Sequence, residues 1–107
     1  MGASKLDIYS ADINKLAAFA KVFSHPARVT ILQYISQQDD CICNDIVDEI
    51  GLSQPTISQH LQVINNAGLL KGHFKGKSFC YCIDLERLKE FQLIMNTFFN
   101  KTKSNCC

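Results

Sequence analysis

The six cysteines of this 107-residue chain are its most reactive side chains, and they occur as three close pairs. The pairs are Cys41 and Cys43, Cys80 and Cys82, and Cys106 and Cys107. In an exported protein such pairs would indicate disulfides, whereas in a reducing compartment they favour metal binding or redox sensing. Because thiolates prefer soft metal ions, the close spacing is suited to a multidentate thiolate site.

Cys41 and Cys43 stand at the start of a short helix that the apolar pattern predicts from about Cys43 to Ile50. A helix N-terminus lowers the pKa of a thiol, because its dipole favours the thiolate. The sequence therefore indicates a reactive thiol pair at this point. The alternative is that both cysteines serve only as small apolar residues.

Cys80 and Cys82 are expected to share one face of a β-strand, because side chains two residues apart point the same way. Phe79, Tyr81 and Ile83 would then take the other face, toward the core. Simple packing or exposure of the two cysteines is the favoured interpretation, and a second thiolate site is the alternative.

The remaining sequence predicts the elements that position these thiols. Apolar residues at helical spacing predict one helix over residues 12–23 and another from Pro26 to about Gln37, where proline suits the first turn. The residues expected on the buried faces of these helices are Ile13, Leu16, Ala17, Ala20 and Phe23, then Val29, Leu32, Tyr34 and Ile35.

Gly51 is expected to form a tight turn, and Ser53 to cap a helix that ends near Asn66 and buries three apolar residues. Those residues are Ile57, Leu61 and Ile64. Beyond Gly68 the pattern alternates over residues 69–74 and 78–83, which predicts a β-hairpin with a basic tip. A last helix is expected from the cap Asp84 to about Asn100.

These elements predict a mainly α protein with one β-hairpin, a winged helix-turn-helix in the order α-α-α-α-β-β-α. The length fits one domain over residues 1–107, with a core over 11–100 and a flexible, cysteine-bearing tail over 101–107. In such a fold the second helix of the helix-turn-helix lies in the major groove of DNA, and the hairpin forms the wing.

The charge pattern supports a DNA-reading role for the segment that begins at Ser53. The chain has a formal net charge of +1, yet residues 53–83 contain no aspartate or glutamate. Short or amide-bearing hydrogen-bonding side chains suit base edges and phosphates, and lysines at the wing suit phosphates. The residues predicted to contact DNA are Ser53, Gln54, Thr56, Ser58, Gln59, His60, Gln62, Lys75 and Lys77. The alternative is an ordinary solvated helix.

The sequence resembles the ArsR/SmtB family of bacterial repressors over roughly residues 12–98. The resemblance is carried by His25-Pro26-Ala27-Arg28, by the stretch from Ser53 to Leu61, by Ala67-Gly68-Leu69-Leu70, and by Gly76-Lys77 with Tyr81. Cys41-Ile42-Cys43 resembles the Cys-x-Cys element of the arsenic and cadmium/lead sensors of that family.

The resemblance implies a homodimer formed by the first and last helices, which binds a palindromic operator and is released by an inducer. In the arsenic and cadmium/lead sensors, the Cys-x-Cys thiolates bind the ion beside the DNA-reading unit. The segment 84–107 has no histidine, which argues against the zinc site that other members carry on the last helix. The third cysteine of the best-known arsenic repressors is replaced here by Ile46.

The resemblance and the thiols together predict As(III) as the inducer, with Cd(II), Pb(II) or Sb(III) as alternatives. Because As(III) prefers three sulfurs, Cys41 and Cys43 need another donor. Cys106 and Cys107 on the tail are the expected suppliers, from the same subunit or its partner. The predicted metal site is therefore Cys41, Cys43, Cys106 and Cys107, and the alternative for the tail is that it has no role.

The residues leave two alternatives to the soft-ion repressor. The first keeps the fold and senses persulfides or oxidants by joining Cys41 to Cys106 or Cys107. The second is a thiolate metal-binding or interaction module that does not bind DNA. An enzyme is not expected, because there is no Cys-x-x-Cys, no nucleophile–histidine–acid pattern and no phosphate loop.

The two remaining histidines are expected to play minor parts, His25 a structural one beside Pro26 and His73 a phosphate contact on the wing. No apolar run reaches the length of a membrane span, and no signal-peptide pattern opens the chain. The sequence therefore predicts a cytoplasmic protein without membrane partners.

Overall fold

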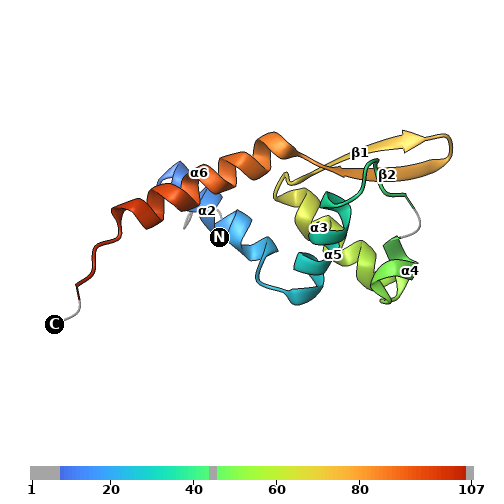
Figure 1. Cartoon of the computed structure of the whole chain (residues 1–107), viewed down its shortest axis with the longest axis horizontal. Helices are drawn as coiled ribbons and strands as arrows, with labels where there is room; N and C mark the ends of the chain where they lie inside the picture. Colours follow the sequence, from blue (N-terminus) through green and yellow to red (C-terminus); the bar gives the residue numbers. More distant parts are fainter. Residues whose placement is uncertain (1–7, 44–45, 106–107) are drawn as a thin grey trace.

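The computed structural model describes residues 8–43 and 46–105, and its element order confirms the winged helix-turn-helix prediction (Figure 1). Within these residues, four helices precede a β-hairpin, and a long helix follows it. Their bounds are α2 Ala11–Val22, α3 Pro26–Ser36, α4 Ile46–Ile50, α5 Gln54–Asn66, β1 Leu70–Lys75, β2 Ser78–Ile83 and α6 Leu85–Lys101.

Side-chain caps explain where the longer helices begin. Ser53 accepts a hydrogen bond from the Thr56 N–H at the start of α5, and Asp84 accepts one from the Arg87 N–H at the start of α6. Each cap satisfies a backbone donor that the first turn of a helix leaves unpaired. Both caps were predicted from the sequence and are confirmed.

Gly51 makes the turn between α4 and α5, and its φ of +80° is a value that other residues rarely adopt. Gly68 follows α5 with a φ of +82°, and an added Cβ would also lie 2.7 Å from the Arg87 guanidinium. These two glycines fix the entry and the exit of α5, and they thereby set its direction relative to α4 and the hairpin.

The core lies where α3, α4 and α5 meet the base of the hairpin. The predicted inward residues of α5 are buried, as are apolar residues of α2, α3 and the hairpin base. The buried hydrophobic residues are Phe19, Val22, Ile31, Leu32, Ile35, Ile42, Ile46, Ile57, Leu61, Ile64, Leu69, Leu70 and Cys80.

Two predictions about the buried helix faces were wrong. In α2 the buried residues are Phe19 and Val22, while Ile13 is 55% exposed. In α3 Ile31 is fully buried, and Val29 is 40% exposed. Helical spacing identifies an apolar stripe but does not say which part of a broad stripe a neighbouring element covers within one chain.

The hairpin gains a third strand-like segment from the chain just before α4. β1 and β2 are antiparallel, with Leu70 opposite Ile83 and Lys75 opposite Ser78. On the outer edge of β2, Ile42 forms an antiparallel bridge with Tyr81. Each of these two residues donates its N–H to the other's carbonyl at 2.8 Å.

The expectation that Cys41 and Cys43 open a helix was therefore wrong. Both flank the bridged Ile42 outside any helix, and α4 as described spans Ile46–Ile50. The competing interaction is the pair of backbone hydrogen bonds to Tyr81, which a helical start at Cys43 would forgo.

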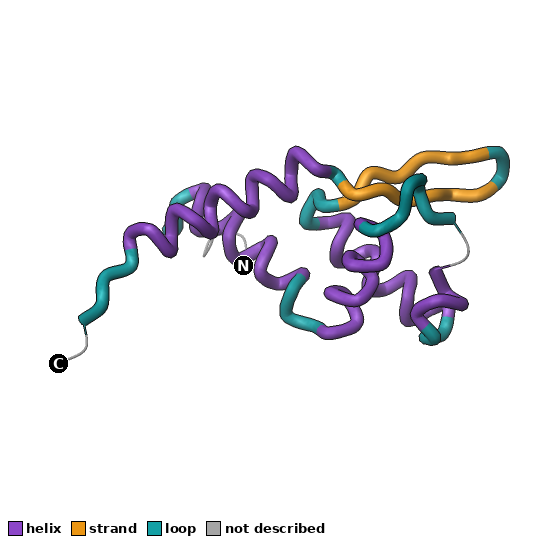
Figure 2. Tube along the Cα trace, viewed as in Figure 1, coloured by secondary structure: helices purple, strands orange, loops and turns teal. Residues whose placement is uncertain are grey.

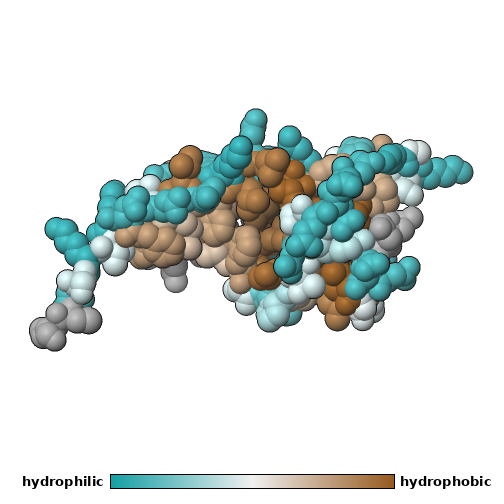
Figure 3. Space-filling view, in the orientation of Figure 1, coloured by the Kyte–Doolittle hydropathy of each residue, from teal (hydrophilic) through white to brown (hydrophobic). Residues whose placement is uncertain are grey.

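α2 and α6 pack together as an arm that leads away from the hairpin (Figure 2). The ring of Phe91 lies 5.2 Å from that of Phe19 and 5.3 Å from that of Phe23, and Lys15 forms a 2.6 Å ion pair with Glu90. No residue of α6 is buried in the single chain. Apolar surface continues along the arm (Figure 3).

Among the described residues, no helix combines the length and the apolar character that crossing a membrane requires.

Candidate functional site

The outer face of α5 carries the polar side chains that the sequence assigned to DNA contact. Ser53, Gln54, Ser58, Gln59 and Gln62 are exposed, whereas Ile57, Leu61 and Ile64 anchor the opposite face in the core. The Gln54 amide donates to the Ser58 hydroxyl at 3.1 Å, and the Ser53 hydroxyl donates to that of Thr56 at 2.9 Å. α5 therefore presents a row of hydrogen-bonding groups without charge.

His60 belongs to a cluster that joins α5 to the start of α3. Its ring centroid lies 4.5 Å from that of His25, and its Nδ1 lies 3.4 Å from an Arg28 nitrogen. The Arg28 guanidinium also donates to the carbonyls of Lys21 and Val22. His60 is half-buried, so the structure places it mainly against protein, although it had been assigned to DNA contact.

Burial and positive neighbours both act on His60. Desolvation is the main cause that lowers the pKa of His60 below its ordinary value, and the charges of His25 and Arg28 lower it further. Both effects disfavour a proton on His60 beside the Arg28 guanidinium.

The wing lysines differ in their surroundings. Lys75 at the end of β1 forms a 2.9 Å ion pair with Asp40, and both side chains are largely exposed. The hydrogen bonds from Lys75 and from the Cys41 N–H hold the pKa of Asp40 below its ordinary value. Lys77 is exposed beside the turn residue Gly76. Lys75 therefore links the wing to the segment that carries the first thiol pair.

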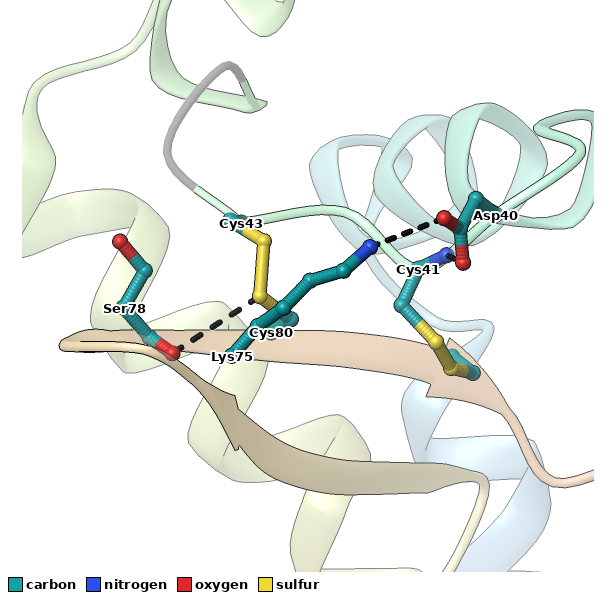
Figure 4. The surroundings of a disulfide bond; sticks show 7 residues. Asp40, Cys41, Cys43, Lys75, Ser78 and Cys80 are labelled. Atoms are coloured by element: carbon teal, nitrogen blue, oxygen red, sulfur yellow. Dashed lines mark hydrogen bonds and ion pairs between the residues drawn. A yellow bond between two sulfur atoms is a disulfide. The ribbon is translucent and has the colours of Figure 1, made fainter.

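That segment brings four cysteines together on one face of the extended hairpin (Figure 4). Because Ile42 is paired with Tyr81, the residues on either side are also opposite each other. Disulfides join Cys41 to Cys82 and Cys43 to Cys80, with Cα–Cα distances of 4.7 and 4.1 Å. Such short distances are those of directly opposed residues that are not hydrogen-bonded to each other.

The expectation of simple packing or exposure for Cys80 and Cys82 was wrong. They do share one face as predicted, but that face meets Cys41 and Cys43. Cys80 is fully buried, and Phe79, which had been assigned to the core side, is 40% exposed. The Phe79 ring instead covers Gly72 on the neighbouring strand. The matching i, i+2 spacing of the two cysteine pairs was the signal that could have joined them.

A histidine of the wing lies beside one of the thiol pairs. The ligand atoms of Cys41, His73 and Cys82 all lie within 4.8 Å of one another, and His73 is exposed. The structure thus groups thiol and imidazole donors from three adjacent strand segments. Cys106 and Cys107, the predicted tail donors, lie outside the described residues.

We expect the two bridges to stabilise the oxidised chain non-additively, because their loops of 41 and 37 residues are nested. In the chain-entropy model, closing one such loop stabilises the folded state by about 4 kcal/mol, because it restricts the unfolded chain. The second bridge restricts the unfolded chain little further, because the first already holds its two cysteines close together. The Cys41→Ala/Cys82→Ala variant should keep most of that stability, and full reduction should lose it. Urea unfolding at one fixed protein concentration measures both. Equal losses would contradict the nested arrangement.

The His60 cluster predicts a pH dependence. A folded-state pKa below the unfolded value of about 6.5 means that the unfolded chain binds the proton more readily, so His60 lowers stability as pH falls through that range. His25→Asn removes one charge but can still cap α3. It should raise the pKa of His60 without fully restoring it, because burial remains the main cause. NMR titration of the ring protons tests this, with His73→Gln as the control. A fall or no change would contradict the cluster.

Comparison with known proteins agrees with these features. A model of the arsR family of bacterial regulatory proteins matches residues 25–71, which span α3 to the start of β1. The chain is 38% identical over 78 residues to an HTH-type transcriptional regulator of Methanocaldococcus jannaschii. The aligned stretch covers 71% of this chain and 85% of that protein.

Two staphylococcal proteins are also similar. The chain is 30% identical over 99 residues to a cadmium resistance transcriptional regulatory protein, a CadC homolog, of Staphylococcus aureus. The aligned stretch covers 92% of this chain and 79% of that protein. It is 31% identical over 74 residues to the arsenical resistance operon repressor of Staphylococcus xylosus, with 69% and 70% covered.

Among solved structures, the homodimeric winged helix-turn-helix DNA-binding domain of a possible ArsR-family regulator from Mycobacterium bovis superposes with a TM-score of 0.64. It covers 89% of this chain and 88% of that domain at 20% identity, which supports the fold. On the family match and the identity to the Methanocaldococcus regulator, this chain belongs to the ArsR family of bacterial regulatory proteins, and it is a DNA-binding transcriptional regulator rather than an enzyme.

Proposed function

We propose that this protein is a homodimeric cytoplasmic repressor that binds operator DNA through α5 and the wing, and that a soft thiophilic ion at Cys41 and Cys43 releases it. The observation that carries the proposal is the position of these thiols, on the chain segment that joins the edge of the wing to α4. An ion bound there acts on the wing and on the helix-turn-helix together.

Polar exposure and local charge support DNA binding by α5. Gln54, Ser58, Gln59 and Gln62 are exposed on one helix, and residues 53–83 contain no acidic side chain to repel phosphate. Amide side chains can pair with base edges, and lysines at the wing can neutralise phosphates. Lys77 is exposed, and Lys75 becomes available when it leaves Asp40.

Exposed apolar surface supports dimerisation through α2 and α6. Ile13 on α2 and Leu93, Phe98 and Phe99 on α6 are each more than half exposed in the single chain. A groove of about 570 Å³ between the two helices is lined by Ile13, Leu93 and Phe98, among others. Contiguous apolar surface of this kind marks protein interfaces. The similar Mycobacterium bovis domain is described as homodimeric.

The relatives' names support a soft inducer, since one is a cadmium resistance regulator and another an arsenical resistance repressor. As(III) is the inducer that the sequence predicts, and Cd(II), Pb(II) and Sb(III) have the same preference for sulfur. The tail cysteines Cys106 and Cys107 are the further thiolate donors that the sequence predicts for this ion. A coupling free energy of about 1–3 kcal/mol would change operator affinity by roughly 5- to 150-fold.

The two disulfides favour a second candidate, a repressor that senses oxidants or persulfides. Each opposed thiol pair loses two electrons and two protons to the oxidant when its bridge forms. The Cys41–Cys82 bridge would then take the part that the sequence assigned to Cys41 with a tail cysteine. The titration below separates this candidate from the soft-ion repressor.

Removing polar groups from α5 should weaken specific DNA binding. We expect Ser58→Ala/Gln59→Ala to weaken binding by at least about 10-fold, because each good base contact is worth about 1–3 kcal/mol. Fluorescence anisotropy measures this on a duplex selected from a random pool by the reduced, ion-free protein. Gln33→Ala, an exposed glutamine on α3, is the matched control. Unchanged binding in the α5 variant would favour an interaction module that does not act on DNA.

The inducer is tested by titrating the same complex with As(III), Cd(II) and polysulfide. We expect a soft ion to weaken binding by the reduced protein roughly 5- to 150-fold. Cys41→Ser/Cys43→Ser should bind DNA normally and resist release, and Cys106→Ser/Cys107→Ser shows whether the tail contributes. Release that survives loss of Cys41 and Cys43 would contradict the proposed site. Release by polysulfide alone would establish the redox candidate instead.

A further inference from the structure

We propose that Cys41, His73 and Cys82 form a site for one divalent d¹⁰ cation, Zn(II) or Cd(II). Two of these donors, His73 and Cys82, lie on the strands of the wing. For its regulatory consequence this inference rests on the proposed function, and it deepens that function by naming a ligand set and an ion class. The observation that carries it is that the three ligand atoms lie within 4.8 Å of one another.

The strand register explains why these three residues converge. Cys41 lies opposite Cys82 across the Ile42–Tyr81 bridge. On the other side of β2, His73 is opposite Cys80, so it shares a face with Cys82 and is diagonal to it. The three donors therefore stand side by side on one face, each on a different strand segment.

The donor set selects the ion. Two thiolates and one imidazole match the ligands that Zn(II), and the softer Cd(II), take in tetrahedral sites. As(III) prefers three sulfurs, which this triad lacks. The imidazole of His73 thus distinguishes a divalent cation from As(III), although both bind thiols.

The surroundings favour entry of an ion at this thiol pair over the other. Cys41 and Cys82 are half-buried, and they line an open hollow of about 290 Å³ together with Asp39 and Asp40. Carboxylates at the rim attract cations. Cys80, in contrast, is fully buried, where a thiolate without a partner would be costly.

The Cys41–Cys82 disulfide and the bound ion are mutually exclusive states of the same two sulfurs. Reduction by a dithiol or phosphine adds two electrons and two protons and gives two thiols. Ion binding then releases those two protons, because the ligands are thiolates. The site is therefore closed in the oxidised chain and open in the reduced one.

A bound ion would hold three strand segments at one point. His73 comes from β1, Cys82 from β2, and Cys41 from the segment that leads into α4. The angle between the wing and the helix-turn-helix is thereby fixed by the ion, and both parts must match one DNA surface at once. This gives the proposed inducer a mechanical link to operator binding.

Cd(II) binding tests the proposal, since Cd–thiolate bonds absorb in the ultraviolet and competition with a chromogenic chelator gives the affinity. We expect the phosphine-reduced full chain to bind one Cd(II) per subunit, and the oxidised chain to bind none at this site. Cys82→Ser and His73→Gln should each lower the affinity by at least about 10-fold, the smallest effect typical of losing even an outer-shell partner. As(III) affinity should not depend on His73.

Cys106→Ser/Cys107→Ser is the matched control, and it should bind Cd(II) as the wild type does. Far-UV circular dichroism and ion-free DNA binding show that each variant is folded. Cd(II) affinity that is unchanged in Cys82→Ser and His73→Gln, or that is lost with the tail cysteines, would overturn the site and leave the proposed function standing. Cd(II) binding that needs the triad but does not weaken DNA binding would support the site and refute the proposed function.

Discussion

The two hydrogen bonds between Ile42 and Tyr81 are the interaction on which the functional arrangement depends. They dock the chain before α4 onto the free edge of β2, which a two-stranded hairpin would otherwise leave unpaired. Because side chains alternate along a strand, this single register decides which residues of both segments face one another. A shift by one residue would turn Cys41 and Cys43 away from Cys80 and Cys82.

The same register explains what could be predicted from the sequence. Local signals sufficed for Ser53, Asp84, Gly51 and Gly68, because a cap or a turn depends on residues next to it in the chain. The pairing of Cys41 with Cys82 spans 41 residues, and no local pattern specifies it. The start predicted for α4 at Cys43 was wrong for this reason, since a distant strand pairs with the backbone of the neighbouring Ile42.

The apolar faces of α2 and α6 show a related limit. The apolar stripe of α2 is broader than one chain covers, so Ile13 remains exposed although the pattern assigns it to the buried face, and Phe98 on α6 is exposed as well. The periodicity of apolar residues shows that one face of a helix is apolar, but it does not show whether the same chain or another molecule covers that face. A second subunit on this arm would reconcile the sequence pattern with the exposure in the single chain.

Charge connects the thiol segment to the wing in a way that composition alone conceals. The chain is nearly neutral, yet Asp40 belongs to the acidic stretch before α4 and Lys75 to the basic wing, and the two meet at 2.9 Å. An exposed pair of this kind adds little stability, so DNA phosphates can compete with Asp40 for Lys75. The Asp40 carboxylate also accepts a hydrogen bond from the Cys41 N–H at 2.7 Å. A cation at the thiols and a phosphate at the wing would therefore act on the same Asp40–Lys75 pair from opposite sides, and this contact joins the segment that carries Cys41 to the wing.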